Sequence, residues 1–285
     1  FHSKEEAIPA PCQTACCRDG ARGKKDCHGH DTRSRSELIN QIAAGEVIER
    51  PASVVKELLE NALDAGATRI AVEVKGSGLE QIRVVDDGWG MTPGELELSI
   101  QRHATSKISH GRDLFSIRTL GFRGEALPSI FSVSRSRISS RAQGAKTGFS
   151  ITLEAGEILE KSMKGMNPGT VVEVNDLFYN TPARKKFLKS TATEQRHIID
   201  VVSRYALVHP TMRFTLSING RDVLNLREGS TLAERVVDLW GKQVRGKLHL
   251  ISEDRSGISI HGILASPEVS RPDRTGITMV NIGVG

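Results

Sequence analysis

Aromatic residues are scarce in this chain of 285 residues, since Phe, Trp and Tyr together make up 4% of it. Proteins that bind single-stranded nucleic acid stack bases on aromatic side chains, so the composition argues against such a platform. The sequence also has no apolar run long enough to span a bilayer, and its first residues lack the basic-then-apolar order of a signal peptide. We therefore expect a soluble, cytoplasmic protein with no membrane partner.

Cysteine is absent after residue 27. The four cysteines and the two histidines that follow them are Cys12, Cys16, Cys17, Cys27, His28 and His30. Their spacing fits none of the common zinc signatures, and the surrounding Gly, Lys, Arg and Asp offer little to bury. We expect no metal site in this segment, and the sequence leaves the role of its cysteines open.

The charge balance is mildly basic, with a formal net charge of +5 and a pI of about 9.1. This is compatible with a polyanionic partner but is common in proteins that never touch nucleic acid. The length is enough for about two domains, each with its own core.

The most informative segment of the chain is KELLENALDAG, residues 56–66. Helical periodicity places Glu57, Asn61 and Asp64 on one side, opposite an apolar stripe formed by Val54, Val55, Leu58, Leu59, Ala62 and Leu63. A carboxylate and an amide four residues apart on one helical face can prepare a water and hold a metal ion. Taken alone, the pattern also fits an ordinary solvated helix face.

A glycine loop, DDGWG at residues 86–90, directly follows the strand-like run at 81–85. Gly88 and Gly90 would let the backbone approach a flat ligand, and Asp86 can accept a hydrogen bond from an exocyclic amine such as that of adenine. By itself this pattern could equally be a turn.

Two further segments are weak signals individually. In GFRGEAL, residues 121–127, glycines open a probable helix whose bare N–H groups would collect phosphate oxygens. In GTVVEV, residues 169–174, Thr170 places a hydroxyl at the head of an apolar strand.

Together, and in this order, these segments resemble the split nucleotide site of the GHKL superfamily, which includes gyrase-type topoisomerases, ninety-kilodalton heat-shock chaperones, histidine kinases and MutL. Five segments are similar in sequence to MutL mismatch-repair ATPases: NQIAAGEVI (40–48), RPASVVKEL (50–58), HATSK (103–107), GFRGEAL (121–127) and DLFYNTPAR (176–184). The likeness runs from about residue 38 to near residue 281. Residues 1–35 are then expected to be a disordered or non-family extension.

The resemblance implies an α+β fold: a GHKL-type ATPase α/β sandwich at residues 36–212, with helices on one face of its sheet, and a partial ribosomal-protein-S5-like transducer domain at residues 213–285. Patterning predicts strands at 68–74, 132–139, 147–153, 157–162 and 170–174. In the second unit it predicts a hairpin turned by Asn219 and Gly220, a helix opened by a Thr231–Glu234 capping box and closed by Gly241, and strands at 247–251 and 259–264.

The resemblance also implies roles for individual residues, with ATP and Mg²⁺ as cofactors. Glu57 corresponds to the general base that activates water, and Asn61 to the Mg²⁺ ligand. Asp86 would hold the adenine amine, helped by Thr170 through a water. The other implied nucleotide contacts are Gly88, Gly90, Thr105, Lys107, Gly121, Phe122, Arg123, Gly124, Glu125, Ala126 and Leu127.

The function implied is a slow, ATP-driven conformational switch of DNA mismatch repair, associated with the nucleoid. Nucleotide binding would pair two N-terminal domains into a homodimer around double-stranded DNA, held at its phosphates without sequence preference. Further partners would be a MutS-like mismatch sensor and a downstream nuclease or helicase. The alternative is a non-catalytic nucleotide-sensing scaffold that binds DNA or protein; a gyrase-like, chaperone-like or kinase function is disfavoured by the wording of the segments.

Candidates for the DNA contact are the basic residues Arg135, Arg137, Arg184, Lys185 and Lys186. Charge runs are often only solvated faces, so that interpretation stays open.

The chain departs from the family pattern at two places. Asp87 stands where the family usually has Asn, and a second negative charge beside Asp86 is expected to raise a pKa or weaken nucleotide affinity. The chain also ends before the arginine and the lysine that family members use toward DNA and the γ-phosphate. We therefore expect it to bind ATP better than it hydrolyses it.

Overall fold

The computed structural model describes residues 48–101, 125–255 and 258–269 of the chain. Its α-helices are α2 (Pro51–Asp64), α3 (Pro93–Ser99), α4 (Ala126–Ser132), α5 (Pro182–Phe187), α6 (Thr191–Val208) and α7 (Leu232–Trp240). Its strands are β1 (Arg69–Lys75), β2 (Gln81–Asp86), β3 (Arg135–Arg141), β4 (Gly148–Glu154), β5 (Glu157–Lys164), β6 (Gly169–Asn175), β7 (Arg213–Ile218), β8 (Arg221–Leu226), β9 (Leu248–Arg255) and β10 (Ile258–Ala265). Short 3₁₀ turns lie at Lys242–Val244 and Pro267–Val269. No helix among these residues has the length and apolar character needed to cross a membrane.

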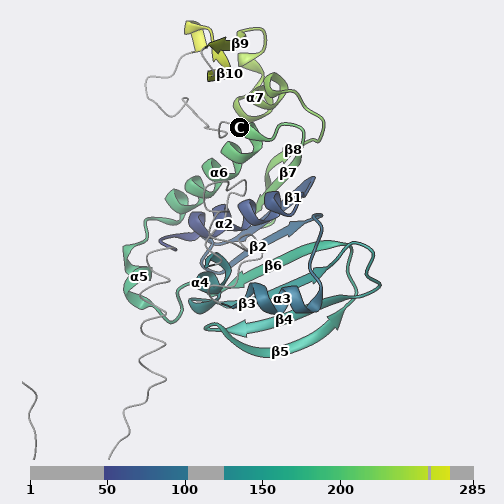
Figure 1. Cartoon of the computed structure of the whole chain (residues 1–285). Coiled ribbons are helices and arrows are strands. Elements are labelled where there is room, and N and C mark those ends of the chain that lie inside the picture. The colour runs from purple at the N-terminus through teal and green to yellow at the C-terminus, as the bar shows by residue number, and fades with distance from the viewer. Residues whose placement is uncertain (1–47, 102–124, 256–257, 270–285) are drawn as a thin grey trace, which may run out of the picture.

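An eight-stranded mixed sheet in the order β5-β4-β3-β6-β2-β1-β7-β8 organises the structure (Figure 1). Its strands alternate: in β1, Ile70, Val72 and Val74 are buried, whereas Arg69 and Glu73 are exposed. The buried side of the sheet packs against residues from several helices in one core, including Leu58 of α2, Leu96 of α3, Ile130 of α4 and Ile198 of α6. The helices therefore cover one face, as expected, and the opposite face is polar.

Helix α2 shows the predicted stripe. Val54, Val55, Leu58, Leu59 and Ala62 are buried. Pro51 begins the helix, and Gly66 follows its end with φ +68°, a conformation that glycine adopts without strain.

The longest helix, α6, was not anticipated. It buries every fourth residue along one stripe: Glu194, Ile198, Val202 and Ala206. The buried Glu194 carboxylate accepts a hydrogen bond from the backbone N–H of Lys189. Its first seven residues, Thr191 to His197, are polar apart from Ala192, and the buried position among them is the charged Glu194, so the apolar periodicity is weak at the start of the helix.

The expected domain boundary at residue 213 falls inside the sheet. Strand β7 pairs in parallel with β1, with Ile70 opposite Phe214, and Phe214 is fully buried in the main core. The hairpin signal at Asn219 and Gly220 correctly predicts the β7–β8 turn, where both residues have positive φ. A turn signal does not say which sheet a hairpin joins, so the boundary was placed too early; the sheet continues to Leu226.

A smaller set of elements follows the sheet. Helix α7 begins with the predicted Thr231–Glu234 capping box and ends at Gly241, and β9 and β10 form a separate two-stranded sheet. In Figure 1 these elements lie at the end of the molecule opposite β5. Strand β3 starts at Arg135 rather than 132, because α4 extends through Ser132.

Candidate functional site

The polar side of α2 carries a small charge cluster. The ammonium Nζ of Lys56 lies 3.5 Å from Glu57 Oε1 and 3.2 Å from Glu60 Oε1. Partial burial alone would lower the pKa of Lys56, but the two carboxylates raise it overall. The hydroxyl of Tyr205 donates to Glu60, so Glu60 is tied to α6. Glu57 and Asn61 are half-buried on the same side of the helix, as predicted.

Asp86 ends β2 with a partly buried carboxylate. Its Oδ1 accepts hydrogen bonds from the backbone N–H of Gly88 at 2.9 Å and of Thr170 at 3.2 Å. Desolvation raises the pKa of Asp86 to about 6, although these two donors act in the opposite direction. At neutral pH the carboxylate is mostly ionised and gains from a further donor, such as an amine.

Thr170 lies directly beside this carboxylate, because Asp86 pairs with Thr170 in the β2–β6 register. The hydroxyl of Thr170 is 2.9 Å from the hydroxyl of Ser140 on β3. Ser140 Oγ also accepts from the backbone N–H of Met91 at 2.8 Å and lies 3.0 Å from Gly169 O. Ser140 thus joins β3, β6 and the glycine loop. Sequence reasoning missed it, since a serine inside a strand carries no distinctive signal.

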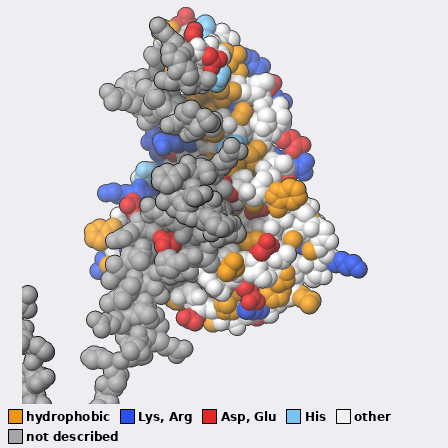
Figure 2. Space-filling view, viewed as in Figure 1, with side chains coloured by type: hydrophobic (Ala, Val, Ile, Leu, Met, Phe, Trp, Pro, Cys, Tyr) orange, Lys and Arg blue, Asp and Glu red, His pale blue; other side chains and the backbone are white. Residues whose placement is uncertain are grey.

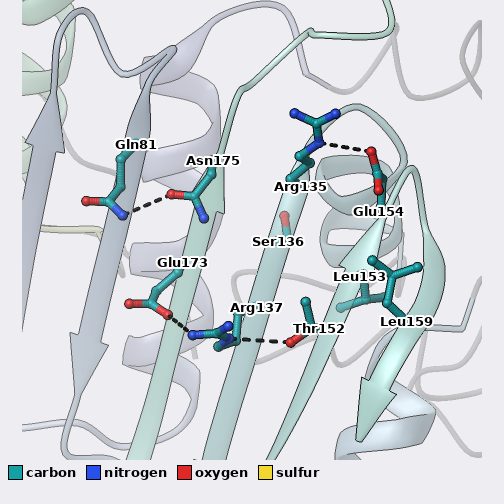
Figure 3. Close-up of a pocket in the computed structure, with 10 residues that line it drawn as sticks. All are labelled: Gln81, Arg135, Ser136, Arg137, Thr152, Leu153, Glu154, Leu159, Glu173 and Asn175. Atoms are coloured by element: carbon teal, nitrogen blue, oxygen red, sulfur yellow. Dashed lines mark hydrogen bonds and ion pairs between the residues drawn. The ribbon is translucent and has the colours of Figure 1, made fainter.

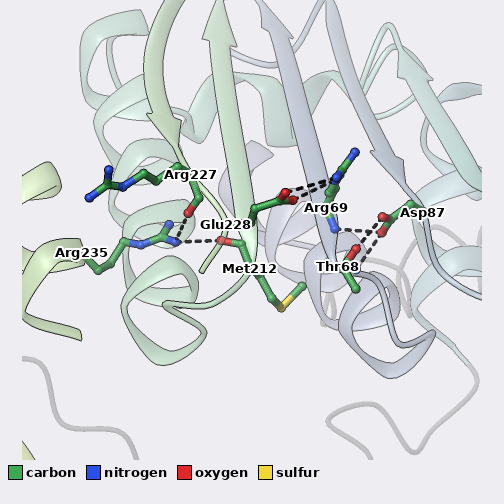
Figure 4. Close-up of polar contacts among 7 residues, drawn as sticks. All are labelled: Thr68, Arg69, Asp87, Met212, Arg227, Glu228 and Arg235. Carbon is green, nitrogen blue, oxygen red and sulfur yellow. Dashed lines mark hydrogen bonds and ion pairs between the residues drawn. The ribbon is translucent and has the colours of Figure 1, made fainter. Parts of the chain in front are cut away.

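Asp87 does not act as a second charge facing the ligand. Its Oδ1 accepts from the backbone N–H of Thr68 at 2.7 Å and of Arg69 at 2.8 Å, and its Oδ2 accepts from Thr68 Oγ1 at 2.7 Å (Figure 4). Partial burial alone would raise the pKa of Asp87, but these hydrogen bonds lower it overall. Desolvation, not Asp87, is the main reason for the raised pKa of Asp86. The expected effect of Asp87 on Asp86 is therefore a minor one.

The glycines of this loop are required by the packing of the chain on itself. A Cβ at Gly90, where φ is +66°, would lie 2.0 Å from Arg141 O, and one at Gly88 would lie 2.7 Å from Ala65 O. The backbone N–H of Trp89 donates to Ala65 O at 2.9 Å, which brings the loop against the end of α2. This packing accounts for both glycines without a ligand, so their nucleotide contacts stay a prediction.

Several of the predicted nucleotide contacts lie outside the described residues, namely Thr105, Lys107, Gly121, Phe122, Arg123 and Gly124. The cysteines of the first 27 residues lie outside them as well. Glu125 is the residue preceding α4, and Ala126 and Leu127 form the first turn of that helix.

The candidate DNA contacts on β3 are engaged within the protein. Arg135 bonds Glu154 at 2.9 Å and Asp176 at 3.2 Å, and its guanidinium lies 4.6 Å from the centroid of the Tyr179 ring. Arg137 lies 3.4 Å from Thr152 Oγ1 and 4.0 Å from a Glu173 carboxylate oxygen. These side chains line a hollow of about 280 Å³ on the polar face of the sheet (Figure 3). The arginines that alternate along β3 suggested a basic stripe. That sequence pattern does not show the carboxylates that neighbouring strands place beside them.

The basic run on α5 behaves differently. Arg184 donates to the carbonyl of Ile48 at 3.0 Å, whereas Lys185 and Lys186 are exposed on a helix that buries none of its residues. Over the face seen in Figure 2, acidic and basic side chains are interspersed rather than gathered by sign. Of the five candidates, Lys185 and Lys186 are best placed to meet a phosphate backbone.

Comparison with known proteins defines the class of this fold. Residues 48–177 match the family model described as "Histidine kinase-, DNA gyrase B-, and HSP90-like ATPase". This range holds Glu57, Asn61, Asp86 and Thr170, and the sandwich described above is the GHKL-type fold.

Comparison with individual relatives identifies the family within this class of ATPases. The ATPase domain of Aquifex aeolicus MutL, solved in complex with ADP, is 39% identical with a TM-score of 0.57, and the match covers 73% of each chain. The DNA mismatch repair protein MutL of Geobacter sulfurreducens is 51% identical over 82% of this chain and 38% of its own length. That of Desulforudis audaxviator is 47% identical over 84% of this chain and 42% of its own length. The chain belongs to the MutL family of DNA mismatch repair proteins and carries its ATPase domain. It spans about two fifths of the length of the Geobacter and Desulforudis proteins.

Proposed function

We propose that this chain is the nucleotide-driven part of a mismatch-repair switch, which binds ATP with Mg²⁺ and hydrolyses it slowly. The observation that carries the proposal is the partly buried Asp86 carboxylate, which is held by two backbone donors beside the Thr170 hydroxyl. The loop that follows Asp86 is hydrogen-bonded to the end of α2, the helix of Glu57 and Asn61. The residues that recognise the purine would thus lie next to the end of α2, the helix that carries the residues acting on the phosphates.

The residues present fit a nucleotide. A carboxylate and a hydroxyl side by side match the amine and ring nitrogen of adenine. Among the described residues there is no group of three or more His, Cys, Asp or Glu side chains able to hold a metal. An ion held by the Asn61 amide oxygen together with phosphate oxygens suits Mg²⁺, which is usually bound by one or two protein ligands plus substrate phosphates.

Each residue then has a separate task. Glu57 accepts the proton of the attacking water, a role that typically contributes a factor of about 10² to 10⁴ in rate. Asn61 would hold the metal, and Mg²⁺ when bound would neutralise phosphate charge. Asp86 accepts a hydrogen bond from the adenine amine, and Thr170 helps through a water. Glu125, Ala126 and Leu127 lie at the start of α4, whose first backbone N–H groups would meet phosphate oxygens.

The wider switch is part of the same proposal. The named relatives are mismatch repair proteins, which supports an ATP-dependent homodimer that holds double-stranded DNA and recruits a MutS-like sensor and a nuclease or helicase in the nucleoid. The elements after Leu226 would form the start of an S5-like transducer unit. The alternative, a nucleotide-sensing scaffold without turnover, shares the binding site and differs only in the action of Glu57.

Phosphate release from Mg-ATP separates these two functions. We expect Glu57→Ala to lower the rate by about 10²-fold or more while leaving Mg-ATP affinity within about threefold, because a general base acts after binding. Glu60→Gln is the matched control: Glu60 contacts the same Lys56, and glutamine keeps an acceptor for Tyr205. Equal phosphate release by wild type and Glu57→Ala would contradict the catalytic assignment and leave the scaffold.

A further inference from the structure

The loop that carries Asp86 has to hold a partly buried carboxylate in place against the cost of its own desolvation. We propose that Asp87 is the positioning residue of the purine pocket: it anchors residues 86–90 to the head of β1 and so fixes the direction of Asp86. The inference rests on the proposed function, because it concerns the same site. It assigns a role to the residue at which this chain departs from the usual family pattern.

The anchor consists of three hydrogen bonds to a segment nearly twenty residues away in sequence. One carboxylate oxygen of Asp87 takes two backbone N–H groups, of Thr68 and Arg69, and the other takes the Thr68 hydroxyl. All three distances lie between 2.7 and 2.8 Å, the short range expected when the acceptor is charged. Figure 4 shows the Asp87 side chain directed toward Thr68 and Arg69.

Neighbouring residues of the loop are held by other elements. Asp86 is bonded to β6 through the N–H of Thr170, and Trp89 is bonded to the end of α2 through Ala65 O. The loop is therefore attached at residue 86 to β6, at residue 87 to the start of β1 and at residue 89 to the end of α2. Releasing the middle attachment would let the backbone at residues 86–87 rotate, which would move the purine-facing carboxylate.

The anchor needs hydrogen-bond acceptors rather than a negative charge. An asparagine at position 87 could accept both backbone N–H groups with its carbonyl oxygen, and its amide could donate to Thr68 Oγ1, which has free lone pairs. Alanine could replace none of these bonds. The two substitutions therefore separate the geometry of the anchor from its charge.

The test compares wild type with Asp87→Asn, Asp87→Ala and Thr68→Val in the full chain, using Glu228→Gln as a control. Glu228 pairs with the side chain of Arg69 at 3.0 Å, so this control removes a carboxylate next to the anchor without touching the loop. Calorimetry measures the affinities for Mg-ATP and Mg-GTP, and hydrogen exchange of residues 86–91 is followed without ligand.

We expect Asp87→Ala to weaken Mg-ATP binding by about 10- to 100-fold, to lower the preference for ATP over GTP and to speed exchange in the loop. Asp87→Asn should stay within about threefold of wild type, Thr68→Val should be intermediate, and Glu228→Gln should be unchanged. A role in stability alone would lower the melting temperature of Asp87→Ala without changing the ATP/GTP preference of the folded protein.

Three results would overturn the inference while leaving the proposed function intact, and the first two are wild-type ATP/GTP preference in folded Asp87→Ala and unchanged exchange of residues 86–91. Loss of binding in Asp87→Asn equal to that in Asp87→Ala would also overturn it, because charge rather than geometry would then be required. Absence of Mg-ATP binding by wild type would instead remove the proposed function and the inference together.

Discussion

The two faces of the main sheet carry polar clusters of opposite character. On the outer face, Arg135 is balanced by Glu154 and Asp176, and Arg137 lies near Glu173. At the inner end of β2, the partly buried Asp86 accepts only from backbone N–H groups among the contacts that the structure describes, and its pKa is raised to about 6. The paired charges of the outer face stabilise each other within the protein and need no ligand. A desolvated carboxylate that no cation neutralises indicates a ligand that supplies a further hydrogen-bond donor.

Of the substitutions that distinguish the two faces of the sheet, Asp86→Asn is expected to have the largest effect on Mg-ATP affinity. An amide presents its own N–H groups as well as an acceptor, so Mg-ATP affinity should fall by about 100-fold or more, measured by calorimetry. The matched outer-face change, Asp176→Asn, removes a carboxylate that pairs with Arg135 and should leave ATP affinity unchanged. Equal losses from both changes would contradict the contrast between the faces.

The pH dependence of ATP binding should follow Asp86. Because the ionised carboxylate accepts the amine and its pKa is about 6, affinity should fall about tenfold between pH 7.5 and pH 5. Calorimetry at the two values, with Asp86→Asn as the reference, checks this. An affinity that is flat across this range in wild type would show that Asp86 is not the acceptor.

Stability should change with pH in the opposite direction. The folded-state pKa of Asp86 is raised from 3.8 to about 6, so its contribution to stability is fully present below about pH 4 and is lost as pH rises through 6. Asp86→Asn should therefore gain stability relative to wild type between pH 5 and pH 8, by about 1 kcal/mol, because only the interval from pH 5 to the folded-state pKa of about 6 contributes, at about 1.4 kcal/mol per pKa unit. Urea unfolding at both values measures it, and a relative loss at pH 8 would contradict the desolvation argument.

A smaller effect is expected on DNA. Replacing both Lys185 and Lys186 by alanine should weaken binding to duplex DNA by about 3- to 10-fold and reduce the slope of log affinity against log salt by about 2. Arg135→Ala should change DNA affinity less, because its guanidinium is already paired with carboxylates. A larger loss from Arg135→Ala than from the double lysine change would place the DNA on the outer sheet face instead.

The smallest effect concerns the outer-face ion pair itself. A double-mutant cycle on Arg135 and Glu154, half-exposed at 52% and 38%, should give a coupling of about 0–1 kcal/mol in unfolding free energy. A coupling free energy well above that range would mean that the ion pair of the outer face stabilises the fold as strongly as the contacts of the inner face.

Local patterns predicted much of the molecule. Helical periodicity placed Glu57 and Asn61 on the correct side of α2, and the capping box at Thr231 and the Asn219 turn were found from a few adjacent residues. These features depend on neighbours within one or two turns of the chain, which a sequence displays directly.

Contacts between distant segments could not be predicted in this way. The partners of Asp87 lie at Thr68 and Arg69, Ser140 reaches Thr170 across a strand pair, and the carboxylates opposite Arg135 come from other strands. The resemblance to MutL implied a purine role for Asp86, but only the structure shows that its carboxylate is partly buried and how its loop is held. No local sequence pattern predicts that β7 pairs in parallel with β1.

The central claim is that the Asp86 carboxylate completes its hydrogen bonding with a purine amine. Carbon-detected NMR titration of that carboxyl group, with and without saturating Mg-ATP, tests it most directly. We expect a pKa of about 6 for Asp86 in the free protein and a lower pKa when nucleotide is bound, because a new donor favours the ionised form. A pKa that is the same in the two states, or that rises on binding, would contradict it.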